Sequence, residues 1–179
     1  MDNLLHSVPS KYITSKEFYA CVEIPSHSKN KYEYNEEMGA LVIDRILYTS
    51  THYPHNYGFI PKTWGQDEDP LDVLVIASEP LVPLSLTKCR PVGVLEMIDN
   101  GMHDEKIIAV CLGDPFYNNY TDISQFPQHL LDEIQNFFTV YKILEHGKET
   151  EVKEFQGHIE AENIVQKGIE RYKEKFPNK

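Results

Sequence analysis

The sequence predicts an α+β domain built on a small barrel or a strongly bent sheet. Five or more segments with the composition of strands come first, and two amphipathic helical patterns follow them along the chain. Several of the expected strands are joined by turn signals, of which Asn100-Gly101 is the strongest hairpin signal. Antiparallel strands with short connections, followed by helices, are typical of this fold class.

The chain length and net charge limit the number of domains and the kinds of partner. At 179 residues the chain is expected to form one domain spanning 1–179. Lys and Arg number 17 and Asp and Glu number 28, so the formal net charge is −11. This charge opposes binding to nucleic acid or to an anionic membrane.

The cysteines and the amino-terminal residues indicate the compartment. Cys21, Cys89 and Cys111 are odd in number and lie among apolar neighbours, which is typical of buried reduced thiols. No apolar run reaches the roughly 18 residues that a membrane span needs, and the amino terminus lacks the basic and apolar regions of a signal peptide. We therefore expect a cytoplasmic protein.

The first two expected strands are Phe18–Ile24 and Lys31–Tyr34. The second alternates strictly, so Lys31 and Glu33 point to one face and the two tyrosines to the other. A basic and an acidic side chain on one face could bind a ligand. They could equally be an exposed pair of charges.

A third strand is expected at Ala40–Tyr48, which is apolar except for Asp44 and Arg45 at its middle. Arg45 could pair with a neighbouring acid, or its planar guanidinium could grip a phosphate. Thr51–Phe59 follows and is rich in Pro, Gly, Asn and aromatic residues, so a tight loop is expected there. Within it, Tyr57 is either a hydroxyl donor to an anion or a packing residue.

The remaining strands are expected at Leu71–Ile76, Thr87–Asp99, Glu105–Leu112 and Glu151–Phe155. The hairpin between the second and third of these brings Asp99 and Asp104 together at its tip, with Lys106 on the same face as Asp104. Hairpin tips are commonly polar, so an exposed tip remains an alternative to a binding site.

Two helices are predicted from apolar residues that recur every three and four positions. The first begins at Pro127 and is expected to continue to Gly147; Tyr141 and Lys142 lie near its end. The second carries its apolar stripe from Ala161 to Phe176. A lysine near a helix C-terminus also suits the helix dipole, so Lys142 alone does not indicate a site.

The acids at the entrance of the strand Leu71–Ile76 carry the strongest functional signal. Asp67, Glu68, Asp69 and Asp72 lie within six residues. Two carboxylates about 5 Å apart repel by roughly 3 kcal/mol at an effective dielectric of 20. A bound cation would remove this repulsion, and a solvated acidic turn is the alternative.

The chemistry of these acids restricts the metal. All-oxygen ligands suit Mg²⁺, Mn²⁺ or Ca²⁺ rather than Zn²⁺, and the spacing lacks the Gly and Glu of an EF-hand loop. The repulsion also predicts that replacing Asp72 with asparagine stabilises the metal-free protein.

These segments together resemble the soluble family I inorganic pyrophosphatases, from about Glu17 to Lys148. The family signature fits Asp67-Glu68-Asp69-Pro70-Leu71-Asp72-Val73 at every position except Glu68. The resemblance implies a small OB-like five-stranded β-barrel with two main amphipathic helices. It also implies hydrolysis of inorganic pyrophosphate to two phosphates by a metal-activated water, several Mg²⁺ ions per active site, and a homo-oligomer, with a hexamer favoured.

The resemblance also assigns roles to residues of this chain. Asp69 is the general base. The metal ligands are Glu33, Asp67, Asp72, Asp99 and Asp104. The residues that bind the two phosphoryl groups are Lys31, Arg45, Tyr57, Lys106, Tyr141 and Lys142.

Two other classes of protein compete with this interpretation. One is a non-catalytic OB-like binding module whose acids hold a structural divalent cation. The other is a Mg²⁺-dependent phosphomonoesterase or nucleotide hydrolase. The sequence assigns no role to His52, His55, Lys62 or Glu68.

Overall fold

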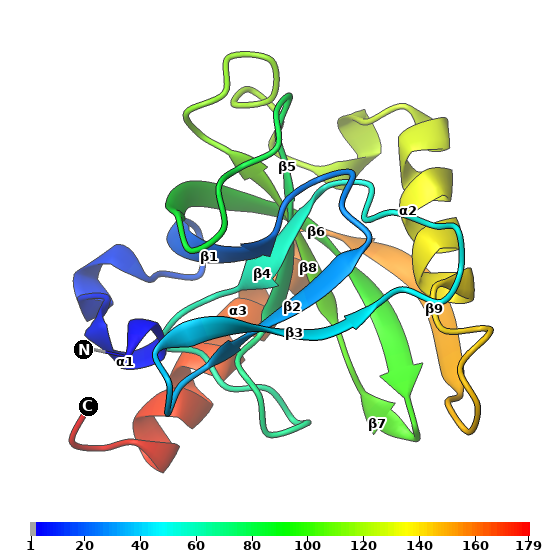
Figure 1. The fold of residues 1–179 in the computed structure, drawn as a ribbon. Helices are drawn as coiled ribbons and strands as arrows, with labels where there is room; N and C mark the ends of the chain where they lie inside the picture. The colour runs from blue at the N-terminus through cyan, green and yellow to red at the C-terminus, as the bar shows by residue number, and fades with distance from the viewer. Residues whose placement is uncertain (1–2) are drawn as a thin grey trace.

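Five strands pair edge to edge in a closed ring (Figure 1). In spatial order they are β1 (Phe18–Ile24), β4 (Asn56–Phe59), β5 (Asp72–Ile76), β8 (Lys106–Cys111) and β6 (Leu86–Asp99), which pairs again with β1. The structure, a computed structural model, describes residues 3–179. The α+β prediction is confirmed, and the ring is the arrangement expected of an OB-like barrel.

The 14-residue β6 is long enough to hold several neighbours. It pairs with β1 at its start and with β8 through its middle, and from Gly93 to its end it pairs with β9 (Thr150–Gly157) and with the short β7 (Met102–His103). Asp99, its last residue, therefore lies beyond the ring at one end. The predicted hairpin tip is present, because the backbone N–H of Asp104 donates to the carbonyl of Met97 over 3.0 Å.

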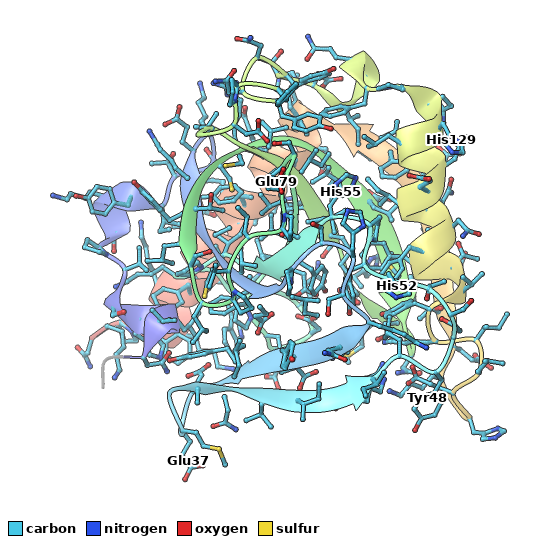
Figure 2. The ribbon with its side chains drawn as sticks, turned by 45° about the horizontal axis from the view of Figure 1, so that its top comes forward. Glu37, Tyr48, His52, His55, Glu79 and His129 are labelled. Carbon is cyan, nitrogen blue, oxygen red and sulfur yellow. The ribbon has the colours of Figure 1, made fainter. Side chains whose placement is uncertain are left out.

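Two predicted strands form a sheet that is separate from the ring. β2 (Asn30–Asn35) and β3 (Ala40–Ile46) form a separate two-stranded antiparallel sheet, which crosses in front of the ring in Figure 1. In Figure 2, Glu37 marks the turn between these strands and Tyr48 lies just beyond the far end of β3. Most residues of β3 are exposed, although the strand is mainly apolar. Its apolar composition therefore did not indicate a position in the core.

The prediction of a loop over Thr51–Phe59 is wrong in its second half, because Asn56–Phe59 forms β4, and all four residues are buried. The turn-forming residues of this stretch serve another purpose. A Cβ on Gly58 would lie 1.9 Å from the carbonyl oxygen of Cys21, so only glycine lets β4 approach β1 this closely.

The pairing of β5 with β8 is parallel, and no local signal in the sequence indicated it. The two strands are separated in the chain by β6, which pairs antiparallel with β8. Hairpin signals report only neighbouring strands, so this long-range pair could not be predicted from them.

The helices differ from the predicted ones mainly at their ends. They are α1 (Leu4–Ser7), α2 (Gln128–Val140) and α3 (His158–Lys175), with short 3₁₀ helices at Ser10–Tyr12 and Ile123–Gln125. α2 ends seven residues before Gly147. Beyond it the backbone N–H of Ile143 donates to the carbonyl of Val140, and the helix tightens into turns. Leu144 is 59% exposed there, so its apolar character did not reflect a continuing buried face.

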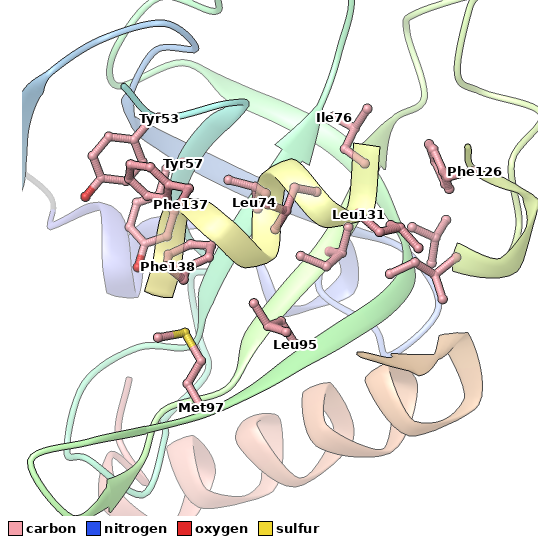
Figure 3. Packing of buried hydrophobic residues seen from close by; sticks show 14 of the residues in the cluster. Tyr53, Tyr57, Leu74, Ile76, Leu95, Met97, Phe126, Leu131, Phe137 and Phe138 are labelled. Atoms are coloured by element: carbon pink, nitrogen blue, oxygen red, sulfur yellow. The ribbon is translucent and has the colours of Figure 1, made fainter. Parts of the chain in front are cut away.

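The core beneath α2 reaches the tyrosines of the predicted site (Figure 3). The ring centroid of Phe137 lies 4.6 Å from that of Tyr53 and 5.1 Å from that of Tyr141. Tyr57 and Phe138 pack in the same cluster. The tyrosine rings are therefore fixed by packing, and their hydroxyls are positioned by the core.

The three cysteines are free and buried, as predicted. Among residues 3–179, no helix is both long enough and apolar enough to cross a bilayer.

Asp122 joins the 3₁₀ turn at Ile123–Gln125 to the start of α3. Its carboxylate accepts hydrogen bonds from the backbone N–H of Ser124 (2.9 Å) and of His158 (3.0 Å), and its Oδ2 lies 2.6 Å from the His158 Nδ1. Burial alone would raise the pKa of Asp122, but these hydrogen bonds outweigh it and hold the pKa well below its ordinary value. The charged carboxylate therefore stabilises the fold.

Replacing Asp122 with alanine is expected to lower the free energy of unfolding by about 1–2 kcal/mol at pH 7. A depressed pKa contributes stability above the unfolded value of about 4 and loses it as the pH falls below that value. Urea unfolding of both proteins from pH 7 to pH 3 should therefore show a constant difference down to about pH 5 and a smaller one below pH 4. An unchanged difference at pH 3 would mean that the charge is irrelevant.

Candidate active site

A cavity of about 320 Å³ lies between the β2–β3 sheet and one end of the strand ring. All of the predicted site residues except Arg45 line it. They are Lys31, Glu33, Tyr57, Asp67, Asp69, Asp72, Asp99, Asp104, Lys106, Tyr141 and Lys142. Residues from widely separated parts of the sequence therefore meet in one place, as the resemblance predicted.

The ends of strands position the charged residues. Asp72 is the first residue of β5 and Lys106 the first of β8, and the parallel pairing sets these two residues directly opposite each other. Asp99 is the last residue of β6. The ends of three strands thus meet at the cavity.

A buried lysine sits between two of the predicted metal ligands. Lys106 Nζ lies 2.5 Å from Asp72 Oδ2 and 2.7 Å from Asp104 Oδ1, and its side chain is 4% exposed. Burial disfavours the charged amine, but Asp72, Tyr57 and Asp104 outweigh it, so the pKa of Lys106 lies well above its ordinary value. Lys106 is therefore a fixed cation.

The other two lysines of the cavity are paired in the same way. Lys142 Nζ lies 2.6 Å from Asp99 Oδ2, and Lys31 forms an ion pair with Glu33 on the same face of β2. The second oxygen of Asp99, Oδ1, is buried and has no hydrogen-bond partner in the described part of the chain. An unpaired buried carboxylate oxygen costs about 1–3 kcal/mol or more, so it indicates a missing cation or donor.

Within residues 3–179, no lysine forms an ion pair with Asp67 or Asp69. Burial, followed by the charges of Asp72 and Asp104, raises the pKa of Asp67 to about 6. Burial and Asp72 raise the pKa of Asp69 as well. Burial is the larger cause for both residues, and the added contribution of Asp72 is the mutual repulsion that the sequence predicted for the acidic stretch. A divalent cation would relieve that repulsion.

Glu68, the one departure from the family signature, is not among the residues that line the cavity. Its backbone is left-handed, with φ at 66°, and its side chain is 83% exposed. The nearest cation is Lys175 Nζ of α3, 3.8 Å from its carboxylate. A long acid at this position is therefore compatible with an unchanged cavity.

Arg45 does not line the cavity. It pairs across the sheet with Lys31 in register, but its guanidinium contacts Asp44 and also Glu145, whose carboxylate lies 3.1 Å from Nε. Arg45 therefore pairs with acids, which was one of the two alternatives. Phosphate binding, the other alternative, stays open because Arg45 lies next to Lys31, which lines the cavity.

The cavity is also lined by residues that the sequence did not single out, among them Glu23, Glu36 and Tyr53. Burial raises the pKa of Glu23 to about 8, although its carboxylate accepts a 2.7 Å hydrogen bond from the backbone N–H of Tyr34. A carboxylate inside an otherwise apolar strand was the available signal for Glu23. Tyr53 shares an aromatic segment with Tyr57, so the sequence alone could not separate a site tyrosine from a packing one.

His52, His55 and Lys62 are not among the residues that line the cavity. In Figure 2, His52 and His55 lie on the segment that leads from β3 to β4. Burial lowers the pKa of His55 to about 4, so its imidazole is neutral at neutral pH.

The donor set fits hard divalent cations, although the side chains are not arranged around one. Within residues 3–179, no three His, Cys, Asp or Glu side chains converge tightly enough to hold a metal ion as they stand. Lys106 and Lys142 occupy the positions between and beside the carboxylates. The carboxylates supply only oxygen ligands, and the unpartnered Asp99 Oδ1 leaves one oxygen ready for an ion, which suits Mg²⁺.

Comparisons with known proteins show the family of this chain. The sequence model of the inorganic pyrophosphatase family matches residues 20–173. The chain is 50% identical over 160 residues to soluble inorganic pyrophosphatase 2 of Chlamydomonas reinhardtii, which covers 89% of this chain and 83% of that protein. It is 40% identical over 176 residues to an inorganic pyrophosphatase of Haloferax volcanii, covering 98% of this chain and 99% of the relative.

A solved structure extends this agreement to the fold. The inorganic pyrophosphatase of Thermus thermophilus superimposes with a TM-score of 0.91 at 38% identity, over 95% of this chain and 99% of that protein. Sequence and fold together show that this chain is an enzyme of the soluble family I inorganic pyrophosphatases.

Proposed function

We propose that the protein hydrolyses inorganic pyrophosphate to two phosphates in a Mg²⁺-dependent reaction, with a metal-activated water as the nucleophile. The observation that carries this proposal is the pairing of lysines with carboxylates inside one cavity. Such a cavity suits a substrate that is itself a complex of a polyanion with divalent cations. The carboxylates can take the cations and the lysines the phosphoryl oxygens.

The residues that would hold Mg²⁺ are Glu33, Asp67, Asp72, Asp99 and Asp104, and the number of acids allows several ions. When bound, Mg²⁺ neutralises phosphoryl charge and lowers the pKa of a coordinated water. The raised pKa of Asp67 and the unpartnered oxygen of Asp99 support this assignment.

The basic residues would exchange partners when substrate binds. Lys31, Lys106 and Lys142 each contact a carboxylate, and each would instead donate to a phosphoryl oxygen. The fixed hydroxyls of Tyr57 and Tyr141 would add hydrogen bonds to the same oxygens. Donors held in place before reaction stabilise the charge that develops on the departing phosphate, which is the main requirement of phosphoryl transfer.

Asp69 would orient the attacking water and accept its proton. Its carboxylate makes no hydrogen bond or ion pair in residues 3–179, whereas its backbone N–H and C=O are bonded to Asp67 Oδ1 and Gly65 N. The loop therefore fixes the backbone and leaves the carboxylate available for a proton transfer.

The test is phosphate release from pyrophosphate, ATP and a simple monoester, with Mg²⁺ and with chelator. We expect turnover of pyrophosphate only with Mg²⁺, and little turnover with Ca²⁺ even though Ca²⁺ binds. Ca²⁺ is larger and its coordination looser, so it would misplace the attacking water. Comparable turnover with Ca²⁺ contradicts the mechanism, and faster release from the monoester favours a phosphomonoesterase. No release at all favours a structural cation site.

We further propose a homohexamer that works in the cytoplasm. Its support is the family resemblance and a set of exposed apolar residues on or just after β3 and after α2, namely Ile43, Ile46, Tyr48, Ile143 and Leu144. Exposed apolar groups of this kind are typical of contacts between subunits. Light scattering after gel filtration measures the mass directly, and a mass equal to that of one chain contradicts the hexamer.

A further inference from the structure

A buried carboxylate outside the cavity holds Arg45 in place. The side chain of Glu145 is 5% exposed, although it follows α2 in a surface turn. Its Oε2 lies 3.1 Å from Arg45 Nε, and its Oε1 lies 2.9 Å from Lys148 Nζ. Burial alone would raise the pKa of Glu145, but these two cations outweigh it and lower the pKa, so the carboxylate is ionised.

The contacts of Arg45 within residues 3–179 leave one guanidinium nitrogen without a partner. Nε contacts Glu145 and Nη1 contacts Asp44, whereas Nη2 is buried and has no hydrogen-bond partner in the part of the chain that the structure describes. A planar guanidinium held at two nitrogens cannot rotate, so the direction of the third is fixed. An unsatisfied buried donor on a cation is costly, which indicates that an anion is its natural partner.

Asp44 connects this arginine to the cavity. Its Oδ2 contacts Arg45 and lies 3.3 Å from Nζ of Lys31, which lines the cavity. Lys31 and Arg45 are also paired residues of β2 and β3. Arg45, whose Nη2 has no partner in residues 3–179, thus lies directly beside Lys31, which is proposed to bind a phosphoryl group.

Glu145 also connects two parts of the site that the strand ladder does not connect. The β2–β3 sheet is separate from the ring, so its backbone pairing does not fix its position against the end of α2. The backbone N–H of Glu145 donates to the carbonyl of Lys142 over 2.9 Å, so one tight turn carries both Lys142 and Glu145. The ion pair between Arg45 and Glu145 therefore connects the β2–β3 sheet, which carries Lys31, to the turn that carries Lys142. This turn lies near the end of β3 (Figure 1).

We propose that Glu145 is a positioning residue for pyrophosphate hydrolysis: by holding Arg45 through Nε, it directs the free Nη2 toward a phosphoryl oxygen. The inference rests on the proposed function, because it needs a phosphoryl group at the cavity. Glu145 itself does not touch the substrate. Its effect on the reaction passes through Arg45, and it is lost when Arg45 no longer has a guanidinium.

The test is a double-mutant cycle between Glu145→Gln and Arg45→Lys, read in kcat/KM for pyrophosphate and in the inhibition constant of the product phosphate. Arg45→Lys keeps the charge but loses the fork, and it should lower kcat/KM at least about tenfold. Glu145→Gln should lower kcat/KM by about tenfold and weaken phosphate inhibition. In the Arg45→Lys background, Glu145→Gln should lower kcat/KM less than about twofold further.

The matched control is Glu149→Gln, which makes the same change in charge four residues away. Glu149 is exposed, and its side chain makes no hydrogen bond or ion pair in residues 3–179, so its kinetics should equal those of the wild type. If Glu145→Gln does not fold, Glu145→Asp replaces it in the cycle. This variant keeps the charge at a shorter reach, and its smaller loss should also disappear in the Arg45→Lys background.

Three results overturn the inference. A lower melting temperature with unchanged kinetics would make Glu145 a structural residue only. Equal losses in both backgrounds would show that Glu145 acts independently of Arg45. Absence of pyrophosphate hydrolysis by the wild type would refute the proposed function first, and the inference with it; that control is read before any variant.

Discussion

Asp72→Asn is expected to lower kcat/KM for pyrophosphate by about a thousandfold or more, because it removes a proposed metal ligand at the centre of the cavity. It should also lose most of the rise in melting temperature that Mg²⁺ gives the wild type, since binding to the folded state stabilises it by mass action. Thermal melting of both proteins in Mg²⁺ and in chelator measures this difference. An equal rise in both proteins would contradict a role in metal binding.

The structure reverses the effect expected for the metal-free protein. From the sequence, removing one of several repelling acids should stabilise it. In the structure, Asp72 Oδ2 lies 2.5 Å from the ammonium of the buried Lys106, which Asp104 alone would then neutralise. Weakening a buried ion pair is destabilising, so we expect the free energy of unfolding in chelator to fall by about 1–3 kcal/mol. A rise in urea unfolding experiments would show that repulsion from Asp67 and Asp69 dominates.

This reversal shows what could not be predicted from the sequence. The acids lie within six residues, so their mutual repulsion is a local property of the chain. Lys106 lies opposite Asp72 only because β5 and β8 pair in parallel. Such pairing depends on tertiary packing, and no local turn signal encodes it.

Local chemistry explains the successful part of the prediction. Alternation placed Lys31 and Glu33 on one face, and the Asn100-Gly101 turn brought Asp104 back toward the end of β6, both of which the structure confirms. Glycine was harder to interpret. At Gly58 it permits the close approach of β4 to β1 rather than a turn, and sequence composition does not distinguish these uses.

The family resemblance assigned roles to residues whose chemistry alone was compatible with more than one role, but it could not describe their contacts. Arg45 was expected among the phosphate ligands, and the structure adds that Asp44 and Glu145 hold it beside the cavity. Glu145 had no signal of its own, because an acid in a charged surface turn is ordinary. Only its burial, together with the unpartnered Arg45 Nη2, makes it notable.

Asp69→Asn separates proton transfer from metal binding within the same acidic loop. The variant keeps the size of the side chain but cannot accept a proton, and loss of a general base typically costs 10²- to 10⁴-fold, so we expect kcat to fall by about a thousandfold. Because the Asp69 carboxylate has no partner in residues 3–179, the melting temperature in chelator should not fall.

The Mg²⁺-dependent rise in melting temperature is the decisive measurement for Asp69. It should stay close to that of the wild type in Asp69→Asn, whereas Asp72→Asn should lose it, although both variants lack one carboxylate of the same loop. If Asp69→Asn also loses the rise, then Asp69 is a metal ligand and another group must accept the proton. The expected contrast follows from position: Asp72 begins a buried strand beside Lys106, whereas Asp69 precedes Pro70 and its carboxylate makes no hydrogen bond or ion pair within residues 3–179.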